Sequence, residues 1–332
     1  MESLGKICIL GGGSWATALA KLLQMNKLPF NWYIKRTEQI EGFYKLGHNP
    51  DYLTNVKFNL AQITFYSNID KAIKESDTII IVIPSPYVKP QLKWIWNKSF
   101  KGKTVFSAVK GIIPNDNMVV SEYMAYNFKI PYENIGVISG PCHAEEVALE
   151  RLSFLTAGCK DNEKARLMAD AITSRILKTK TSNDVVGIEL AAVLKNIYAI
   201  AVGLCQGLNY GDNFQAVLMT NCAREMEHYL EKVAPIEDRN ILEPHYIGDM
   251  LVTGYSQFSR NRTLGTMLGK GYSVKTAQLE MEMIAEGYYG AKCIKELNEK
   301  FKVDMPIADT VYKILYEKDS PRVSIEKLIE LF

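Results

Sequence analysis

A single lysine stands in the middle of a long apolar segment. Residues 188–203 read Ile-Glu-Leu-Ala-Ala-Val-Leu-Lys-Asn-Ile-Tyr-Ala-Ile-Ala-Val-Gly, which predicts a helix inside its domain with Lys195 at the centre. Burying an ammonium group is costly unless it is paired or has a task, and burial lowers its pKa toward the range useful for proton transfer. Lys195 is therefore a candidate general acid. The alternative is a structural lysine, paired with an acid such as Glu189 or reaching the surface.

A glycine-rich turn near the N-terminus is a candidate dinucleotide site. Residues 11–16, Gly-Gly-Gly-Ser-Trp-Ala, match the pattern GxGxxA and stand between an expected strand at 7–10 and an expected helix at 14–25. Gly11 permits a tight turn, Gly13 permits close approach of a pyrophosphate, and the helix N-terminus offers N–H groups to phosphates. The alternative is a flexible turn, but the position directly between strand and helix favours cofactor binding.

The end of the second expected strand, residues 30–34, bears on the choice of cofactor. NAD-binding domains usually carry an acid about 20 residues after the glycines, for the ribose 2′-hydroxyl. Here Lys35 and Arg36 occupy that place, and the first acid is Glu38. Two cations suit a 2′-phosphate, so NADPH is the expected preference, with NADH possible. Otherwise the two cations are a solvated strand end.

Three further clusters could bind a ligand. Ser-Arg-Asn-Arg at 259–262 precedes an expected helix at 263–268 and can form an anion cradle there, although such a tetrapeptide is also common in solvated turns. Lys110 follows one expected strand, and Ser-Gly-Pro-Cys at 139–142 ends another. Ligands of open α/β sheets bind at that edge.

Short apolar runs separated by helical patterns fill the first half of the chain. The expected strands are residues 7–10, 30–34, 63–66, 78–83, 104–109, 135–139 and 152–158. Such runs predict a parallel sheet covered on both faces, an N-terminal Rossmann-like doubly wound α/β domain over residues 1–187. Beyond it the apolar spacing is helical, as at 188–203, 216–233 and 276–297, which predicts an all-helical C-terminal domain over 188–332.

Composition excludes several classes of function. The 332 residues carry 39 Lys and Arg against 37 Asp and Glu, a balance that argues against a generally basic nucleic-acid binder. The longest apolar runs are interrupted, by Pro84 and by Lys195 and Asn196, so no membrane insertion is expected. The six cysteines and four histidines show no metal-ligand or disulfide spacing, and no signal peptide is recognisable. We therefore expect a cytoplasmic protein without a metal.

These motifs together resemble those of the bacterial-type NAD(P)-dependent glycerol-3-phosphate dehydrogenases. The resemblance covers nearly the whole chain and rests on residues 11–18, 109–111, 138–141, 195–196, 248–249, 259–262 and 286–287. It implies a Rossmann domain joined to a helical substrate-binding and dimerisation domain, and a homodimer. It also implies reversible reduction of dihydroxyacetone phosphate to sn-glycerol 3-phosphate with NAD(P)H, for glycerophospholipid synthesis.

The resemblance further implies individual roles. Lys195 is the proton donor and acceptor. Substrate contacts are implied for Lys110, Gly140, Cys142, Lys195, Asp249, Ser259, Arg260 and Asn261. Cofactor contacts are implied for Ser14, Trp15, Lys35, Lys110, Ala144, Arg260, Ile284 and Glu286, beside Gly11, Gly13 and Arg36. Arg260 with Asn261 is expected to hold the phosphate, Asp249 to orient Lys195, and Lys110 to reach the site from the first domain.

One departure and two alternatives remain open at this point. Cys142 stands where the family commonly has Thr or Ser, which leaves open whether its side chain or only its backbone N–H contacts substrate. The alternatives are a related two-domain hydroxy-acid dehydrogenase and a non-catalytic NADP(H) sensor. A sensor would not need the set formed by Lys195, Lys110 and Arg260.

Overall fold

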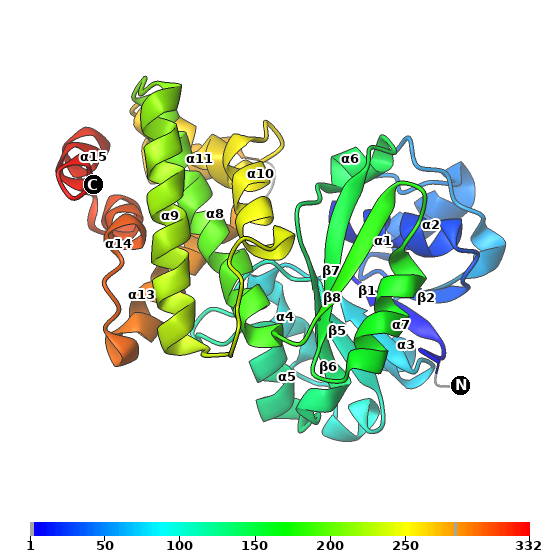
Figure 1. Cartoon of the computed structure of the whole chain (residues 1–332). Coiled ribbons are helices and arrows are strands. Elements are labelled where there is room, and N and C mark those ends of the chain that lie inside the picture. The colour runs from blue at the N-terminus through cyan, green and yellow to red at the C-terminus, as the bar shows by residue number, and fades with distance from the viewer. Residues whose placement is uncertain (1–2, 282–283) are drawn as a thin grey trace. The chain divides into compact units, whose positions relative to one another are not determined.

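The computed structural model describes residues 3–281 and 284–332, which form two compact units (Figure 1). The first, called here the sheet unit, comprises residues 3–109 and 120–185. The second, the helical unit, comprises residues 110–119 and the described chain from 186 onward. The short segment 110–119 thus leaves the sheet unit and packs with the helices. It therefore departs from a simple division of the chain near residue 187.

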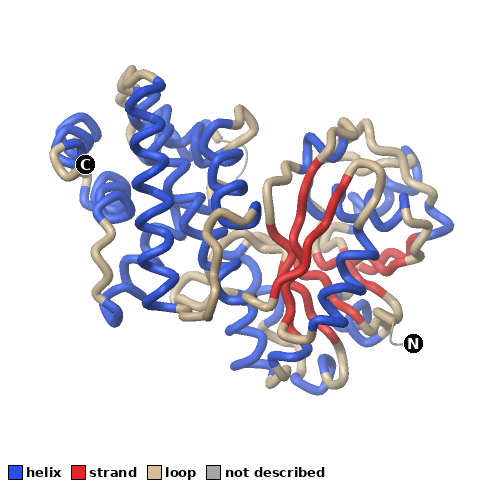
Figure 2. The backbone as a smooth tube through the Cα atoms, in the orientation of Figure 1, coloured by secondary structure: helices blue, strands red, loops and turns tan. Residues whose placement is uncertain are grey.

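An eight-stranded sheet forms the centre of the sheet unit (Figure 2). The strands lie in the order β3-β2-β1-β4-β5-β6-β7-β8. Their bounds are β1 Ile7–Leu10, β2 Phe30–Tyr33, β3 Ile63–Tyr66, β4 Thr78–Ile81, β5 Thr104–Ser107, β6 Ile135–Ser139, β7 Ser153–Cys159 and β8 Leu177–Ser182. All neighbours pair in parallel except β6 and β7, which are antiparallel. The chain order reverses between β1 and β4, which is where open α/β sheets bind ligands.

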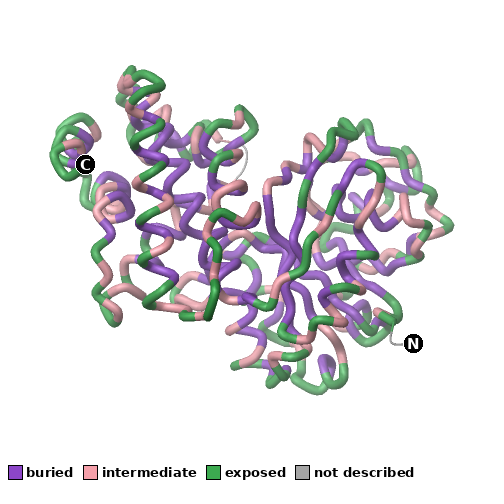
Figure 3. Tube along the Cα trace, viewed as in Figure 1, coloured by how far each residue is buried: buried purple, intermediate pink, exposed green. Residues whose placement is uncertain are grey.

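Helices cover the sheet because its central strands are apolar on both faces. Every residue of β1, β2 and β4 is buried, and the interior strands are purple in Figure 3. Ile7 and Ile9 belong to the core formed with α1, α6 and α7, whereas Cys8 and Leu10 point to the opposite face. The helices of this unit are α1 Ser14–Met25, α2 Thr37–Leu46, α3 Ile69–Lys74, α4 Ser85–Leu92, α5 Val120–Phe128, α6 Ala144–Ala148 and α7 Asn162–Ile172, with 3-10 turns η1 Leu60–Gln62, η2 Asn97–Phe100 and η3 Tyr132–Asn134.

The predicted architecture, a Rossmann-like doubly wound sheet followed by a helical domain, is confirmed. The sheet is nevertheless mixed rather than parallel throughout, because β7 runs against β6. The sequence analysis also missed β8, whose residues Leu-Lys-Thr-Lys-Thr-Ser lie at the edge of the sheet, with only Leu177 buried. An edge strand needs no continuous apolar run, so it gives little signal in the sequence.

The helical unit is built around α8 Val185–Gly207, which is almost entirely buried. Around it lie α9 Asp212–Val233, α10 Asp249–Tyr255, α11 Arg260–Gly269, α12 Val274–Glu280, α13 Glu286–Phe301, α14 Pro306–Tyr312 and α15 Pro321–Ile329, with π-helical turns η4 Pro244–Gly248 and η5 Lys313–Glu317. Contrary to the sequence expectation, α8 is long and apolar enough to cross a membrane by length and composition. Since 94% of its most apolar window is buried inside the protein, it is a core helix.

One predicted helix is wrong as a continuous element. Residues 276–297 are divided between α12 and α13, with extended backbone at Met281 and Ala285 and with residues 282–283 outside the described chain. The new helix start places Gly287 against α8, where an added Cβ would lie 2.5 Å from the carbonyl oxygen of Asn196. Apolar periodicity does not reveal such an interruption, because both helices present apolar faces to the same core.

Four glycines bring the backbones of α8 and α11 into contact. A Cβ added at Gly203 would lie 2.1 Å from the carbonyl oxygen of Arg262, and one at Gly265 would lie 2.1 Å from that of Ile200. Gly207 and Gly269, each one turn further along, face each other in the same way. No side chain fits between these helices, so the residues that flank the glycines are held at a fixed separation.

Substitution of Gly265 by alanine should therefore destabilise the helical unit. Because the nearest atoms belong to backbone, the helices must move apart, and the expected loss is about 3 kcal/mol in the free energy of unfolding. Gly211→Ala is the matched control, since nothing lies within 4 Å of a Cβ added there, and should cost less than about 1 kcal/mol. Urea denaturation measures both, and equal losses would contradict this account of α8 and α11.

Candidate active site

Lys195 lies in the middle of α8 and is 4% exposed. Its Nζ donates hydrogen bonds to Asp249 Oδ1 at 2.7 Å and to Thr253 Oγ1 at 2.9 Å. Asp249, at the start of α10, is 1% exposed and also accepts from Lys110 Nζ at 3.0 Å and 3.2 Å. One buried carboxylate thus binds two ammonium groups. The acid that pairs with Lys195 is Asp249, not its helix neighbour Glu189, and the ammonium does not reach the surface.

This cluster sets the protonation of its members. Burial lowers the pKa of Lys195 to about 7, the charge of Lys110 lowers it too, and the adjacent Asp249 opposes the shift. Burial by itself would raise the pKa of Asp249, but Lys110 and Lys195 outweigh it and hold that pKa below its ordinary value. Lys195 can therefore exchange a proton near neutral pH while Asp249 stays ionised.

Thr253 completes the surroundings of the Lys195 ammonium and was missed by the sequence analysis. Its hydroxyl donates to the carbonyl oxygen of Asp249 at 2.6 Å, one helical turn back. With its proton engaged there, Oγ1 presents a lone pair to Lys195. The spacing of four residues from Asp249 on one helix is the signal that could have identified it.

A chain of side-chain amides links four segments of the helical unit next to this cluster. Asn196 Nδ2 donates to the carbonyl oxygen of Lys110 at 2.7 Å. Asn261 Nδ2 donates to Asn196 Oδ1 at 2.8 Å, and the Gly287 N–H donates to Asn261 Oδ1 at 2.9 Å. Segment 110–119, α8, α11 and α13 are therefore held in register beside Lys195.

The Ser-Arg-Asn-Arg run lies at a helix start, as expected, but the helix begins three residues earlier than residue 263. Ser259 caps α11 by accepting a hydrogen bond from the Arg262 N–H at 3.2 Å, and the helix starts at Arg260. The exposed Arg260 side chain donates from Nη1 to the carbonyl oxygen of Ile284 at 3.0 Å, and Glu286 begins α13 close by. The predicted residues Ser259, Arg260, Asn261, Ile284 and Glu286 are thus brought together.

The expectation that Lys110 reaches the site from the first domain does not hold. Its segment, 110–119, belongs to the helical unit, so its contacts with Asp249 and Asn196 lie within one unit. The sequence placed Lys110 correctly after β5 but gave no sign that the chain crosses to the helices there. Packing against α8 and α13, not local propensity, decides where this short segment lies.

In the sheet unit the glycine turn follows β1 at the point where the strand order reverses. Gly11 has φ +132°, and an added Cβ would lie 2.7 Å from the carbonyl oxygen of Val82, so glycine is required. Nothing lies within 4 Å of a Cβ added at Gly13. The first turn of α1, which contains Ser14 and Trp15, has no acidic residue and no side-chain cap. The open space and N–H groups fit the pyrophosphate of a dinucleotide.

Polar side chains that the sequence analysis missed hold this turn in place. Trp32 Nε1 donates to the carbonyl oxygen of Gly11 at 2.7 Å. The carbonyl oxygen of Gly12 accepts from Gln39 Nε2 at 2.7 Å and from Asn49 Nδ2 at 3.1 Å. Isolated Gln and Asn residues carry no signal for such roles in a sequence. Only the fold brings them to the turn.

The two cations after β2 have different surroundings. Arg36 forms an ion pair with Asp51, whereas Lys35 is exposed. Asp51 was not singled out in the sequence, yet it places an acid beside the group expected to bind a 2′-phosphate. The pairing bears on cofactor preference because a phosphate and Asp51 would compete for Arg36.

The segment after β6 also lies in the sheet unit. Gly140 has φ +138°, and an added Cβ would lie 3.0 Å from the carbonyl oxygen of Phe154. Cys142 is buried in the apolar core with α1, and Ala144 begins α6. Within residues 3–281 and 284–332, no group of three His, Cys, Asp or Glu side chains is placed to hold a metal ion.

Comparisons with known proteins agree with this arrangement. Residues 6–165 match the family model of the NAD-dependent glycerol-3-phosphate dehydrogenase N-terminus, and residues 184–326 match that of its C-terminus. The glycerol-3-phosphate dehydrogenase [NAD(P)+] of Staphylococcus epidermidis is 35% identical over 326 residues, 98% of each chain. That of Oceanobacillus iheyensis is 35% identical over 328 residues, 98% of this chain and 93% of the other.

Solved structures share the fold. The glycerol-3-phosphate dehydrogenase of Coxiella burnetii superimposes with a TM-score of 0.89 at 26% identity, covering 98% of this chain and 99% of the other. A D-mandelate dehydrogenase shares the fold less closely, with a TM-score of 0.61 at 17% identity over 94% of this chain and 98% of the other. Together with the family matches over both parts of the sequence, these findings mean that the chain belongs to the NAD-dependent glycerol-3-phosphate dehydrogenase family.

Proposed function

We propose that this protein reduces dihydroxyacetone phosphate to sn-glycerol 3-phosphate, reversibly, with Lys195 as the group that delivers the proton. The family membership identifies it as an NAD(P)-dependent oxidoreductase and does not favour the hydroxy-acid dehydrogenase or the sensor. The single observation that carries the assignment of Lys195 is its buried ion pair with Asp249. A steady-state assay with NADPH, NADH and a panel of phosphorylated and unphosphorylated ketones tests the proposed reaction.

The surroundings of Lys195 suit proton delivery to a carbonyl oxygen. An ammonium group has three N–H bonds, and among the described residues Asp249 and Thr253 accept two of them. The third N–H remains for the ketone oxygen, where hydride arrival builds negative charge. Lys110, on the same carboxylate, supports this function as a second cation near that charge. Asp249 orients both ammonium groups and offsets the cost of burying them.

The start of α11 suits a phosphate dianion. Arg260 lies in the first turn of a ten-residue helix, where the backbone N–H groups and the helix dipole favour an anion. A guanidinium group adds charge-assisted hydrogen bonds, and Ser259 and Asn261 lie beside it. Holding the phosphate there would orient the ketone, so that binding energy far from the reacting carbon contributes to the rate.

The cofactor supplies a hydride from the nicotinamide ring. In the sheet unit, Gly11, Gly13, Ser14 and Trp15 are the residues that would hold its pyrophosphate. Contacts to substrate from Lys110, Gly140 and Cys142, and to cofactor from Lys110, Ala144, Arg260, Ile284 and Glu286, remain part of the proposal. Because the Cys142 side chain is buried in the apolar core, we propose its backbone N–H as the contact.

We further propose a preference for NADPH, a homodimer and a cytoplasmic location. The preference is supported by the two cations Lys35, which is exposed, and Arg36, and it is opposed by Asp51, which forms an ion pair with Arg36. In this proposal the domain of residues 1–187 binds the cofactor, and the domain of residues 188–332 binds the substrate. Segment 110–119 is the exception, since it contributes Lys110 from within the helical unit.

Lys195→Met should lower the rate of ketone reduction by roughly 10²–10⁴-fold, the usual contribution of a positioned general acid. NADPH affinity should change little, and the protein should fold, because Met fills a similar volume without a charge to bury. Lys21→Met is a matched control, since Lys21 is also buried and paired, with Glu150. Full turnover in the Lys195 variant, or an equal loss in the control, would reject the assignment.

The lowered pKa of Lys195 also predicts a dependence of stability on pH. In the unfolded chain this lysine keeps its proton up to about pH 10.5, whereas in the native protein it loses it near pH 7. The unfolded state therefore binds more protons between these values, and the free energy of unfolding should rise with pH there, relative to Lys195→Met. Denaturation series at pH 7 and pH 10 measure this. If the difference in the free energy of unfolding between the wild type and Lys195→Met is the same at pH 7 and at pH 10, the lowered pKa of Lys195 is contradicted.

The same pKa should appear in the kinetics. Reduction needs the protonated lysine, so kcat/KM for reduction should fall as pH rises through about 7, and kcat/KM for the reverse oxidation should rise. Because the Lys110 charge lowers the pKa of Lys195, Lys110→Gln should move both midpoints upward. The titration of the substrate phosphate is common to both proteins. If the midpoint of the pH dependence of kcat/KM does not move in Lys110→Gln, a group other than Lys195 is responsible for that pH dependence.

Arg260→Ala should raise KM and lower kcat for dihydroxyacetone phosphate together, since phosphate binding also orients the ketone. Unphosphorylated dihydroxyacetone is the internal control, because the variant and the wild type should reduce it equally poorly. Arg260→Lys keeps the charge but loses the planar fork and should fall between them. Equal losses on both substrates would show that Arg260 acts through the cofactor or the fold rather than through the substrate phosphate.

Replacing Lys35 and Arg36 by serine should weaken NADPH binding by about 1–3 kcal/mol and leave NADH nearly unchanged. Asp51→Asn should act in the opposite direction, strengthening NADPH binding, because it releases Arg36 and removes an anion beside the 2′-phosphate. Fluorescence titration of each variant with both cofactors measures the effects. Equal changes for NADH and NADPH would exclude the two cations as the 2′-phosphate site.

A further inference from the structure

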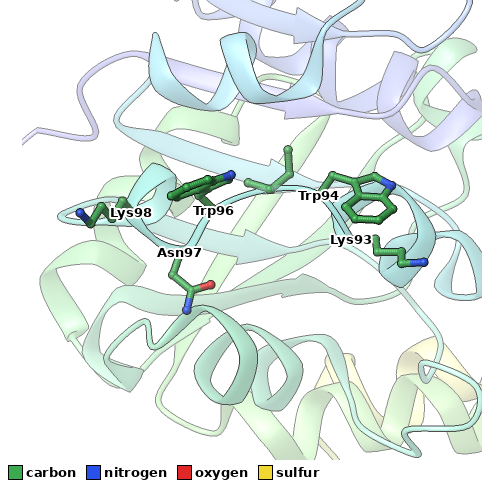
Figure 4. Close-up of a pocket in the computed structure, with 6 residues that line it drawn as sticks. Lys93, Trp94, Trp96, Asn97 and Lys98 are labelled. Atoms are coloured by element: carbon green, nitrogen blue, oxygen red, sulfur yellow. The ribbon is translucent and has the colours of Figure 1, made fainter.

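Two of the four tryptophans lie on the surface of the sheet unit, in the loop between α4 and η2. Trp94 is 78% exposed and Trp96 is 76% exposed, and Figure 4 shows both indoles projecting from this short loop. Trp32, by contrast, is fully buried. Single exposed apolar side chains are common in folded proteins, but two indoles exposed in one short loop form a patch, and such patches mark interaction surfaces. Neither indole has a role in the proposed reaction.

In the sequence, the charges on either side of these indoles are of one sign. Residues 84–103 contain five lysines and no acid. Lys93, Lys98 and Lys101 are exposed. The Lys93 ammonium lies 4.7 Å from the centre of the Trp94 ring, and the Lys98 side chain extends on the Trp96 side of the loop (Figure 4). The loop therefore combines two interfacial aromatic side chains with a set of cations.

The topology places this loop away from the glycine turn. The chain leaves the carboxyl end of β4, returns along α4 and enters β5 parallel to β4, so the loop before β5 lies at the amino ends of the strands. Gly11 follows the carboxyl end of β1, at the opposite edge of the same sheet. A partner at the Trp94–Trp96 loop would leave the cofactor edge open.

The same edge carries two further pairs of a lysine over an aromatic ring. Lys129 lies 4.9 Å from the centre of the Tyr126 ring at the end of α5, and Lys160 lies 5.0 Å from that of Tyr132. Helix α5 packs on η2 through Phe128 and Phe100, which connects the first pair to the loop. The acids of this edge include Asp70, ion-paired with Lys74, Asp161, ion-paired with Lys164, and the exposed residues Glu75, Asp77 and Glu133.

We propose that the Trp94–Trp96 loop binds reversibly to the surface of a bilayer that contains anionic lipid. Indoles favour the headgroup level, where the ring is in an apolar layer and its N–H in a wet one. Lysines beside them are attracted by lipid phosphates. Single-stranded nucleic acid fits less well, because it is held by a charged groove with successive stacking platforms, and this loop is a short projection. The binding is peripheral and involves no spanning segment.

The test uses the full chain and sucrose-loaded vesicles, one set of equal phosphatidylglycerol and phosphatidylcholine and one set of phosphatidylcholine alone. We expect sedimentation with the first set, with a blue shift of tryptophan fluorescence that decreases as NaCl is added. Trp94→Ala with Trp96→Ala should lower the partition coefficient roughly tenfold or more. Lys93, Lys98 and Lys101 changed together to Gln should lower it roughly 100-fold, at about fivefold for each lysine.

Matched controls come from other exposed positions. Leu279→Ala removes a side chain that is 78% exposed in the helical unit, and Lys178→Gln removes an exposed lysine from β8. Neither should change partitioning, and all variants should keep the turnover of the wild type, which shows that they fold. Three outcomes would overturn the proposal: no binding to anionic vesicles at low salt, equal binding by the tryptophan variant, or tryptophan-dependent binding of polyuridylate without binding of vesicles.

Discussion

The carboxylate of Asp249, buried between two ammonium groups, is the interaction on which the site depends. An isolated charge is costly in such apolar surroundings, and burial alone would favour the neutral forms of Lys195 and Asp249. Together they form a cluster of net charge +1, in which Asp249 stays ionised and Lys195 titrates near neutral pH. The same ion pairs join segment 110–119, α8 and α10. The ion pairs that set the protonation of Lys195 therefore also hold these three segments together.

This cluster needs a frame that holds helices at a fixed distance. The glycines of α8 and α11 bring the two backbones into contact, which sets Asn196 opposite Asn261. The amide chain then continues to Gly287 at the start of α13. Backbone atoms in contact cannot move closer together, so the four glycines fix the distance between α8 and α11. They thereby also fix the position of Arg260, at the start of α11, relative to Lys195 on α8.

Each unit has a helix N-terminus that can bind an anion, but the residues around the two N-termini differ. In the sheet unit the first turn of α1 has no acid and no side-chain cap, and distant polar side chains fix the glycine turn through its carbonyl groups. In the helical unit Ser259 caps α11, and Arg260 adds a full charge. The first arrangement suits a pyrophosphate approached closely by backbone, and the second suits a dianion held by a side chain.

The sequence by itself determined the α/β and helical halves, the glycine turn, the buried lysine and, to within three residues, the helix start after Ser259, because each depends on local periodicity or on residues adjacent in the chain. It did not determine the partner of Lys195, the roles of Thr253, Gln39, Asn49 and Asp51, or the break between α12 and α13. It also did not reveal β8, the antiparallel pairing of β7, or that Lys110 belongs with the helices. Most of these features depend on contacts between residues far apart in the chain, and only packing in three dimensions decides which of the many available polar side chains meet.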